Sequence, residues 1–88
     1  MLDRPDFSPR QRIVDIVVQI LAKHSISRAV LPDDDLREIG LSSLDMVNLM
    51  LAVEAKFDIE IPESDMTPAN FRSVSAIEVL VGTLLQAK

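Results

Sequence analysis

Along this chain, capping residues repeatedly stand in front of apolar residues that recur at helical spacing, and no segment alternates long enough to build a sheet. At Ser8-Pro9 a capping serine precedes a proline at the first helical position, and Gln11 can complete a capping box with Ser8. We expect a first helix from here to near His24. Its apolar face consists of Ile13, Ile16, Val17, Ile20 and Leu21.

A second helix start follows Gly40-Leu41. Ser42 can cap a helix here, with Asp45 at the third helical position. We expect this helix to run from Ser43 to about Phe57. At about 100° per residue, the side that should face the core carries Met46, Leu49, Met50, Val53 and Phe57. The opposite side carries Leu44, Asn48, Leu51 and Ala55.

The rest of the chain predicts one short helix and one long one. Asp58 to Glu63 is expected to be extended, and a threonine followed by proline indicates a short helix over Thr67 to Phe71. Ser73 or Ser75 can cap the last helix. The buried face of that helix is expected to be Val74, Ile77, Leu80, Val81 and Leu84.

Together these elements predict an all-α fold: a small bundle of three main helices plus one short helix, with a long first connection over residues 25–40. Residues 1–7 are expected to be a flexible lead-in, and residues 8–88 to form one domain. The acidic run Asp33 to Asp35 is expected to be a solvated turn that caps a helical turn around Leu36, because it lacks the acid spacing and central glycine of a calcium loop. The predicted core is Ile13, Val17, Ile20, Leu36, Leu49, Met50, Val53, Phe57, Ile61, Phe71, Ile77, Val81 and Leu84.

The composition narrows the possible functions. Fourteen acidic residues against nine Lys and Arg leave a formal charge of −5, which argues against nucleic acid or an anionic membrane as a partner and suits basic proteins. The chain has no Cys, no run resembling a signal peptide and no apolar stretch long enough to cross a membrane. We therefore expect a cytoplasmic monomer without membrane insertion.

The groups that an active site needs are missing. His24 is the only histidine, so a multi-histidine metal cage is excluded, and its place at a helix end suits an interaction with the helix dipole. Gly40 and Gly82 are too few glycines for a phosphate-cradling loop, and Ser43 lacks the flanking glycines of a nucleophile elbow. A helix-turn-helix DNA reader is disfavoured because the second helix is not basic. We expect neither an enzyme nor a metal site.

The leucines on the outer side of the second helix have two interpretations. They are either ordinary exposed residues or a docking surface for a partner protein. In the second case Leu44, Asn48 and Leu51 form the surface, with Asp45 and Glu54 at its borders. Apolar residues flanked by acids would suit a partner with an apolar cleft rimmed by Lys or Arg.

The run from Asp35 to Glu63 resembles the centre of an acyl carrier protein. In that family an acidic residue precedes a Leu-Gly-Leu-like stretch, then come Asp-Ser-Leu, a helix ending in Phe, and Glu-Ile-Pro. The matching residues here are Ile39, Gly40, Leu41, Ser43, Leu44, Asp45, Val47, Leu49, Glu54, Phe57, Glu60, Ile61 and Pro62. The order of the helices agrees as well, so the resemblance covers about residues 10 to 86.

The resemblance implies that Ser43 carries 4′-phosphopantetheine, transferred from coenzyme A by a phosphopantetheinyl transferase that uses Mg²⁺. Helix geometry alone does not separate Ser42 from Ser43, but only Ser43 is followed by Leu44 and Asp45 in the family's order. The arm would hold cargo as a thioester and deliver it to partner enzymes, while the carrier catalyses nothing. The alternative is a helical interaction domain that has this fold but no arm.

Two departures from the family pattern bear on the cargo. Ser42 stands where the family usually has Asp, which removes a charge that could assist transferase recognition. Asn48, Ala55 and Lys56 occupy positions that are often Glu in fatty-acid carriers, so general fatty-acid synthesis is in doubt. The second helix is also similar to that of stand-alone carriers loaded with amino acids by synthetase-like ligases. Acyl and aminoacyl cargo both remain open, as do the pathway and the loading enzyme.

Overall fold

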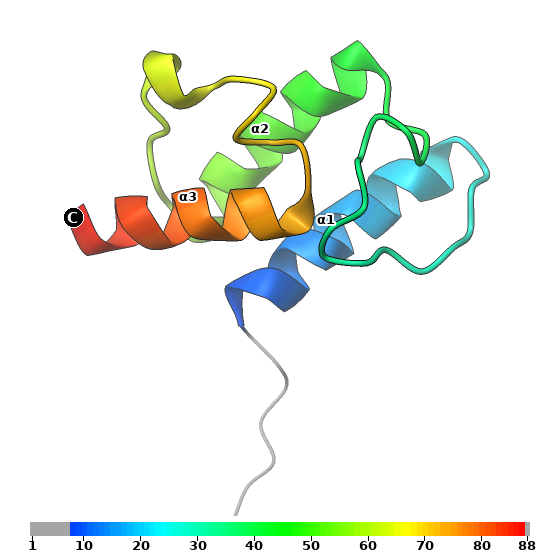
Figure 1. Ribbon diagram of the computed structural model, residues 1–88, viewed down its shortest axis with the longest axis horizontal. Coiled ribbons are helices and arrows are strands. Elements are labelled where there is room, and N and C mark those ends of the chain that lie inside the picture. The colour runs from blue at the N-terminus through cyan, green and yellow to red at the C-terminus, as the bar shows by residue number, and fades with distance from the viewer. Residues whose placement is uncertain (1–7, 88) are drawn as a thin grey trace, which may run out of the picture.

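The computed structural model describes residues 8–87 and shows the all-α fold that the sequence predicted (Figure 1). Three α-helices, α1 (Pro9–Lys23), α2 (Ser43–Phe57) and α3 (Val74–Ala87), are separated by a long first connection and a shorter second one. The second connection contains a single 3-10 turn, Glu63–Asp65, and no strand occurs within residues 8–87. The predicted lead-in over residues 1–7 lies outside the described residues.

The helices begin and end where capping chemistry places them. The Ser8 hydroxyl accepts a hydrogen bond from the Gln11 backbone N–H at 3.2 Å, and α1 starts at the next residue. Asp58 ends α2 in the left-handed conformation, with φ of 53°. Of the two serines that could cap α3, Ser73 does so, because its hydroxyl accepts from the Ala76 backbone N–H at 3.1 Å.

The short helix predicted over Thr67 to Phe71 is wrong: this segment forms turns, and the short helical element is the 3-10 turn Glu63–Asp65. The Asn70 backbone N–H donates to the Thr67 carbonyl at 3.2 Å, a bond that closes a turn rather than an α-helix. The Asn70 amide also donates to the Asp65 carbonyl at 2.9 Å. These bonds and the full burial of Phe71 hold the segment against the core in this compact form.

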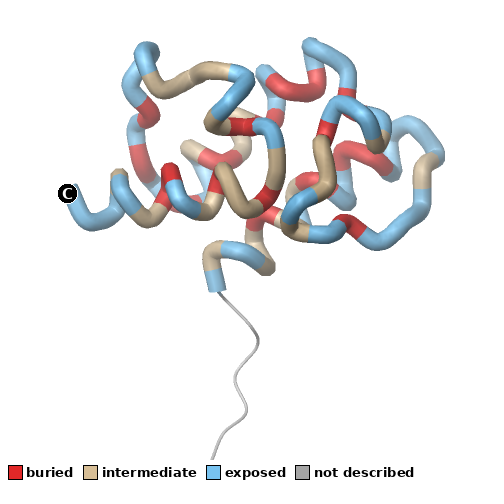
Figure 2. The backbone as a smooth tube through the Cα atoms, in the orientation of Figure 1, coloured by how far each residue is buried: buried red, intermediate tan, exposed pale blue. Residues whose placement is uncertain are grey.

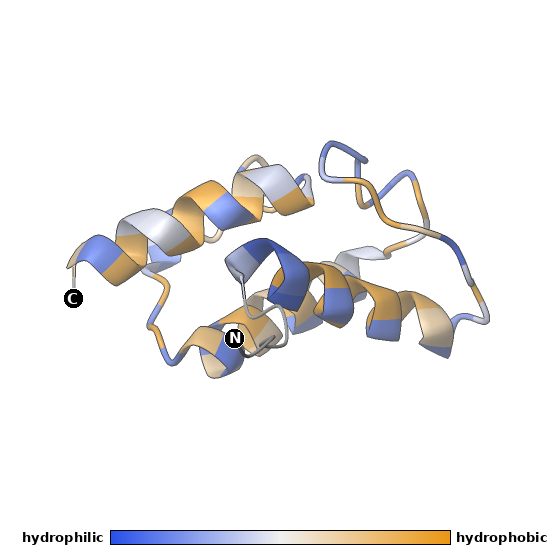
Figure 3. Cartoon of the chain, turned by 90° about the horizontal axis from the view of Figure 1, so that it is seen from below, coloured by the Kyte–Doolittle hydropathy of each residue, from blue (hydrophilic) through white to orange (hydrophobic). Residues whose placement is uncertain are grey.

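An aliphatic core lies where α1 packs against both α2 and α3, as the buried segments in Figure 2 show. The residues predicted for the core are buried, except Met50 and Leu84, which are only half-buried. Hydrophobic and hydrophilic residues lie on different sides of α1 (Figure 3), as expected for a helix that covers a core on one side. Seven further residues are buried: Leu21, Met46, Val74 and Leu80 lie on the helix faces predicted to be apolar, whereas Val30, Leu41 and Ile59 lie in the connections.

The long first connection is fastened to the start of α3. The Leu36 backbone N–H donates to the Arg72 carbonyl at 2.9 Å, and the Ser75 backbone N–H donates to the Pro32 carbonyl at 3.0 Å. Asp35 caps the turn around Leu36, as predicted. The connection therefore forms part of the domain, and it delivers the chain to the start of α2 in a defined position.

Gly40 supports that position. Its φ is +135°, a conformation that other residues rarely adopt, and a Cβ added to it would lie 2.7 Å from the Ile26 side chain and 3.3 Å from that of Leu21. Any other residue at position 40 would strain the backbone and displace the Ile26 side chain, so glycine is strongly favoured where the connection passes the end of α1.

Candidate functional site

The two serines at the start of α2 have different roles in the structure. The Ser42 hydroxyl accepts a hydrogen bond from the Asp45 backbone N–H at 3.1 Å, and the Asp45 carboxylate accepts from the Ser42 backbone N–H at 2.8 Å. This is a complete capping box. Ser43 is the first helical residue, it is exposed, and no residue within 8–87 hydrogen-bonds to its hydroxyl. Of the two hydroxyls, only that of Ser43 is left uncommitted by the fold.

The Asp45 carboxylate also binds the end of α1. His24 Nε2 lies 2.8 Å from Asp45 Oδ2, so the residue that ends α1 contacts the capping box of α2. The hydrogen bond from the Ser42 backbone lowers the pKa of Asp45 below its ordinary value, and the contact with His24 lowers it further. Sequence reasoning placed His24 at a helix end but missed this partner. The contact could have been suspected from the sequence, because the only histidine of the chain lies at the end of one helix and a carboxylate lies at the start of the next.

Two of the residues predicted to border the docking surface have structural contacts instead. Asp45, predicted at the border of the docking surface, is 9% exposed and lies inside the contact just described, so little of its carboxylate is accessible. Glu54 is half-buried, and its carboxylate accepts a hydrogen bond from the Ile61 backbone N–H at 2.8 Å. Glu54 therefore fastens the segment that leaves α2. Both carboxylates therefore have contacts within the fold that the sequence analysis did not predict.

The outer face of α2, by contrast, is as apolar and exposed as predicted. Leu44 is 69% exposed and Leu51 is 54% exposed, and Asn48 lies exposed between them. Val47 is half exposed and belongs to the same face, although the sequence analysis did not place it there. We refer to Leu44, Val47, Asn48 and Leu51 as the outer face.

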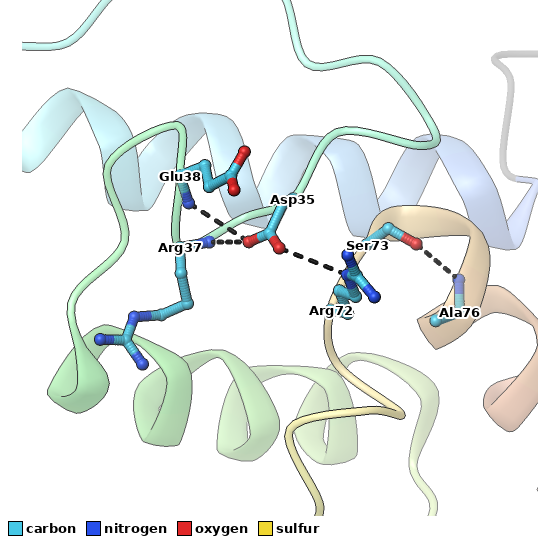
Figure 4. A network of polar contacts seen from close by, with 6 residues as sticks. All are labelled: Asp35, Arg37, Glu38, Arg72, Ser73 and Ala76. Carbon is cyan, nitrogen blue, oxygen red and sulfur yellow. Dashed lines mark hydrogen bonds and ion pairs between the residues drawn. The ribbon is translucent and has the colours of Figure 1, made fainter.

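A groove of about 770 Å³ opens beside Ser43, and we refer to it as the Ser43 groove. One wall is α2, and the other is formed by the 35–38 turn and the segment before α3. Asp35 joins these two parts of the second wall: its carboxylate accepts from the backbone N–H groups of Arg37 and Glu38 and pairs with Arg72 at 3.3 Å (Figure 4). The lining residues are Asp35, Arg37, Glu38, Ser43, Met46, Val47, Met50, Met66, Pro68, Ala69 and Arg72.

This site suits the covalent attachment of a group. A nucleophilic serine needs a base, and the only histidine of the chain contacts Asp45 rather than Ser43. Within residues 8–87, no three His, Cys, Asp or Glu side chains gather in a way that could hold a metal ion. An exposed hydroxyl at a helix N-terminus is suited to a phosphate ester, because the helix dipole and free backbone N–H groups favour an anion there. The residues present therefore fit a phosphopantetheine arm.

Comparison with known proteins agrees with this geometry. Residues 11–80 match the family model described as "Phosphopantetheine attachment site", and the chain belongs to this family of carrier proteins. Its cofactor is 4′-phosphopantetheine, on which carriers of this kind hold their cargo as a thioester.

Within this family, the chain is similar to several aminoacyl carrier proteins. The chain is 49% identical to aminoacyl carrier protein 1 of Bradyrhizobium diazoefficiens over 77 residues, which is 88% of this chain and 86% of that protein. It is 46% identical to aminoacyl carrier protein 2 of the same bacterium, over 82% of this chain and 81% of that protein. Among solved structures, it resembles the carrier protein bound to the glycine:[carrier protein] ligase of Bradyrhizobium japonicum, with a TM-score of 0.71 and 49% identity over 84% of this chain and 96% of that chain.

No helix within the part of the chain that the structure describes is both long and apolar enough to cross a membrane.

Proposed function

We propose that this protein carries an aminoacyl group on a phosphopantetheine arm attached to Ser43. The observation that supports Ser43 is the difference between the two serine hydroxyls at the start of α2. The Ser42 hydroxyl accepts a hydrogen bond in the capping box, whereas the Ser43 hydroxyl is exposed and has no hydrogen-bond partner within residues 8–87. The bound arm would supply a terminal thiol that holds the cargo. The chain itself would orient the arm and present it, without catalysing a reaction.

The support for aminoacyl cargo is the set of similar proteins. Two relatives at 49% and 46% identity are named aminoacyl carrier proteins, and one similar structure is described as a glycylated carrier protein complexed with its ligase. The low charge of α2 agrees with a dedicated loading enzyme. From Ser43 to Phe57 there are two acids and one base, a net charge of −1, and both acids are engaged within the fold. Long-range attraction of α2 to basic enzymes is weak when the net charge of the helix is only −1.

The proposed partners are a phosphopantetheinyl transferase, an amino acid:carrier protein ligase and the enzymes that receive the cargo. We propose the outer face of α2 as the surface they contact. Leu44 and Leu51 expose enough apolar area to seat in a cleft, and the face adjoins Ser43 directly. Recognition would depend on shape more than on charge. The protein would act in the cytoplasm as a monomer.

The attachment site is tested by intact mass measurement after incubation with coenzyme A, Mg²⁺ and a transferase of broad specificity. The wild-type protein should gain the mass of one phosphopantetheine. Ser43→Ala should gain none, while the matched variant Ser42→Ala should still be modified. Modification of Ser43→Ala, or no gain by the wild type, would contradict the proposal, and the second result would favour an interaction domain without an arm.

The cargo is tested on the modified protein. With ATP, an amino acid such as glycine and a candidate ligase, the protein should gain the mass of one aminoacyl group. Hydroxylamine should then cleave the thioester, releasing the aminoacyl group as a hydroxamate and restoring the free thiol. The same protein is offered to a malonyl transferase of fatty-acid synthesis. Efficient malonyl loading without any aminoacyl loading would contradict the proposed cargo.

A further inference from the structure

Arg37 differs from the other arginines that the structure describes. Arg10, Arg28 and Arg72 each pair with a carboxylate, at 2.9, 3.3 and 3.3 Å, and Arg12 lies over the Phe57 ring. The Arg37 side chain makes no hydrogen bond or ion pair with any residue in 8–87. A guanidinium offers five donors in a planar fork that matches carboxylate and phosphate, so this side chain is available for an anion.

The Arg37 side chain lies in the same groove as Ser43. The Arg37 backbone N–H donates to the Asp35 carboxylate at 3.0 Å, which fixes the base of the side chain in the turn. From there the guanidinium extends away from Asp35 and Arg72, toward the first turn of α2 (Figure 4). Arg37 and Ser43 both line the Ser43 groove. The free guanidinium and the free hydroxyl therefore share one cavity.

We infer that Arg37 binds the phosphodiester through which the arm is joined to Ser43, and so holds the start of the arm at the Ser43 groove. This inference rests on the proposed function, since it requires an arm at Ser43.

The charges around Ser43 explain why such a partner is needed. A phosphodiester adds one negative charge to a chain whose formal charge is already −5. Asp45 lies two residues away with a lowered pKa, so its carboxylate remains charged near neutral pH, and Glu38 lines the same groove. Arg72 is already paired with Asp35. Arg37 is therefore the arginine of the groove that is left to offset the phosphate, and a charge-assisted bidentate pair is the strong form of such a contact.

The rest of the groove fits the portion of the arm beyond the phosphate. Met46, Met50 and Met66 give it an apolar lining, and methionine adapts readily to irregular shapes. If Arg37 holds the phosphate, the arm starts at the mouth of this lining instead of moving freely in solvent. Its thiol is then presented from a smaller set of positions.

The experiment compares the modified wild type with modified Arg37→Ala, Arg37→Lys and Arg28→Ala. Arg28→Ala is the matched control, because it removes an exposed arginine that does not line the groove. Arg37 is exposed, so its replacement should leave the circular dichroism spectrum of the protein unchanged. The readouts are the ³¹P NMR relaxation of the phosphodiester and the ¹⁵N resonance of the Arg37 side chain before and after modification.

In the wild type, attachment of the arm should shift the Arg37 Nε–H resonance, and the ³¹P nucleus should relax as a group held by the protein. In Arg37→Ala the ³¹P relaxation should become that of a mobile group, with Arg28→Ala unchanged and Arg37→Lys in between. If the modified wild type shows no Arg37 shift and Arg37→Ala leaves the relaxation unchanged, the inference alone is overturned. If the wild type gains no mass, the proposed function fails and the inference fails with it.

Discussion

The inner and outer faces of α2 are both apolar, yet their surroundings differ. Leu49 and Val53 on the inner face are 0% exposed and lie in the core, whereas Leu44 and Leu51 on the outer face are more than half exposed. The same helix therefore stabilises the domain with one side and keeps the other apolar without burying it. Residue type alone does not show whether a leucine of α2 is buried or exposed. Its position along the helix, counted from the capped start, does.

The inner face should be the one that stability depends on. Leu49→Ala should lower the free energy of unfolding by about 3 kcal/mol, because it removes a fully buried side chain and leaves a cavity. Leu51→Ala, on the outer face, should change it by less than about 0.5 kcal/mol, as is usual for surface substitutions. Urea unfolding followed by circular dichroism measures both. Equal losses for the two variants would mean that the faces are not distinct.

The outer face should be the one that partners depend on. Leu51→Asp should slow modification and loading by roughly tenfold, since it would bury a carboxylate in an apolar contact, and a tenfold effect corresponds to about 1.4 kcal/mol. The change should leave the fold intact, because the side chain is 54% exposed. Rates follow from the mass gained over time. Val79→Asp is the matched control, since Val79 is 70% exposed on α3, away from the outer face. If both variants slow loading alike, the effect is general charge repulsion and α2 is not the docking surface.

The two faces share the capped start of α2, and this start can be weakened without touching either face. Ser42→Ala should cost about 1 kcal/mol of stability, the usual value for a lost N-cap, and Ser43 should still be modified. Urea unfolding and intact mass are the two measurements. A Ser42→Ala protein that is as stable as the wild type would show that the capping box contributes nothing measurable.

Acidification should loosen the same start. The pKa of Asp45 is lowered from its ordinary value of 3.8 in the folded protein, so its stabilising contribution is fully present above that value and is lost as the pH falls through the folded pKa. Asp45→Asn should therefore reduce the steepness of the acid-induced loss of stability below about pH 5, the point at which such losses begin. Thermal unfolding across this pH range measures it. An unchanged pH profile would mean that Asp45 is not among the carboxylates responsible.

Local signals predicted most of the fold, because caps and periodicity act over a few residues. The start of α2 follows from Ser42 and Asp45, and the exposure of Leu44 and Leu51 follows from helical geometry. The short helix was misplaced because the segment around Asn70 is shaped by its contact with Asp65 and by the burial of Phe71, neither of which spacing can reveal.

The site was predictable in part for the same reason. The exposure of Ser43 and of the outer leucines follows from their places in α2. The burial of Asp45 depends on His24, which lies 21 residues earlier in the chain, and the engagement of Glu54 depends on the path of the chain after the helix. The Ser43 groove depends on where the segment before α3 lies. Contacts of this kind exist only once the chain has folded, so a helical wheel could not reveal the structural contacts of either carboxylate.

The contact between His24 and Asp45 also bears on which residues of α2 can change during evolution. Asp45 is committed to joining α1 and α2, so its replacement is limited by the requirement to fold. Leu44, Asn48 and Leu51 have no comparable commitment and can change at little cost in stability. If the proposed docking surface is correct, a lineage of such carriers can acquire a new loading enzyme by exchanging a few outer residues, while the position of Ser43 is kept.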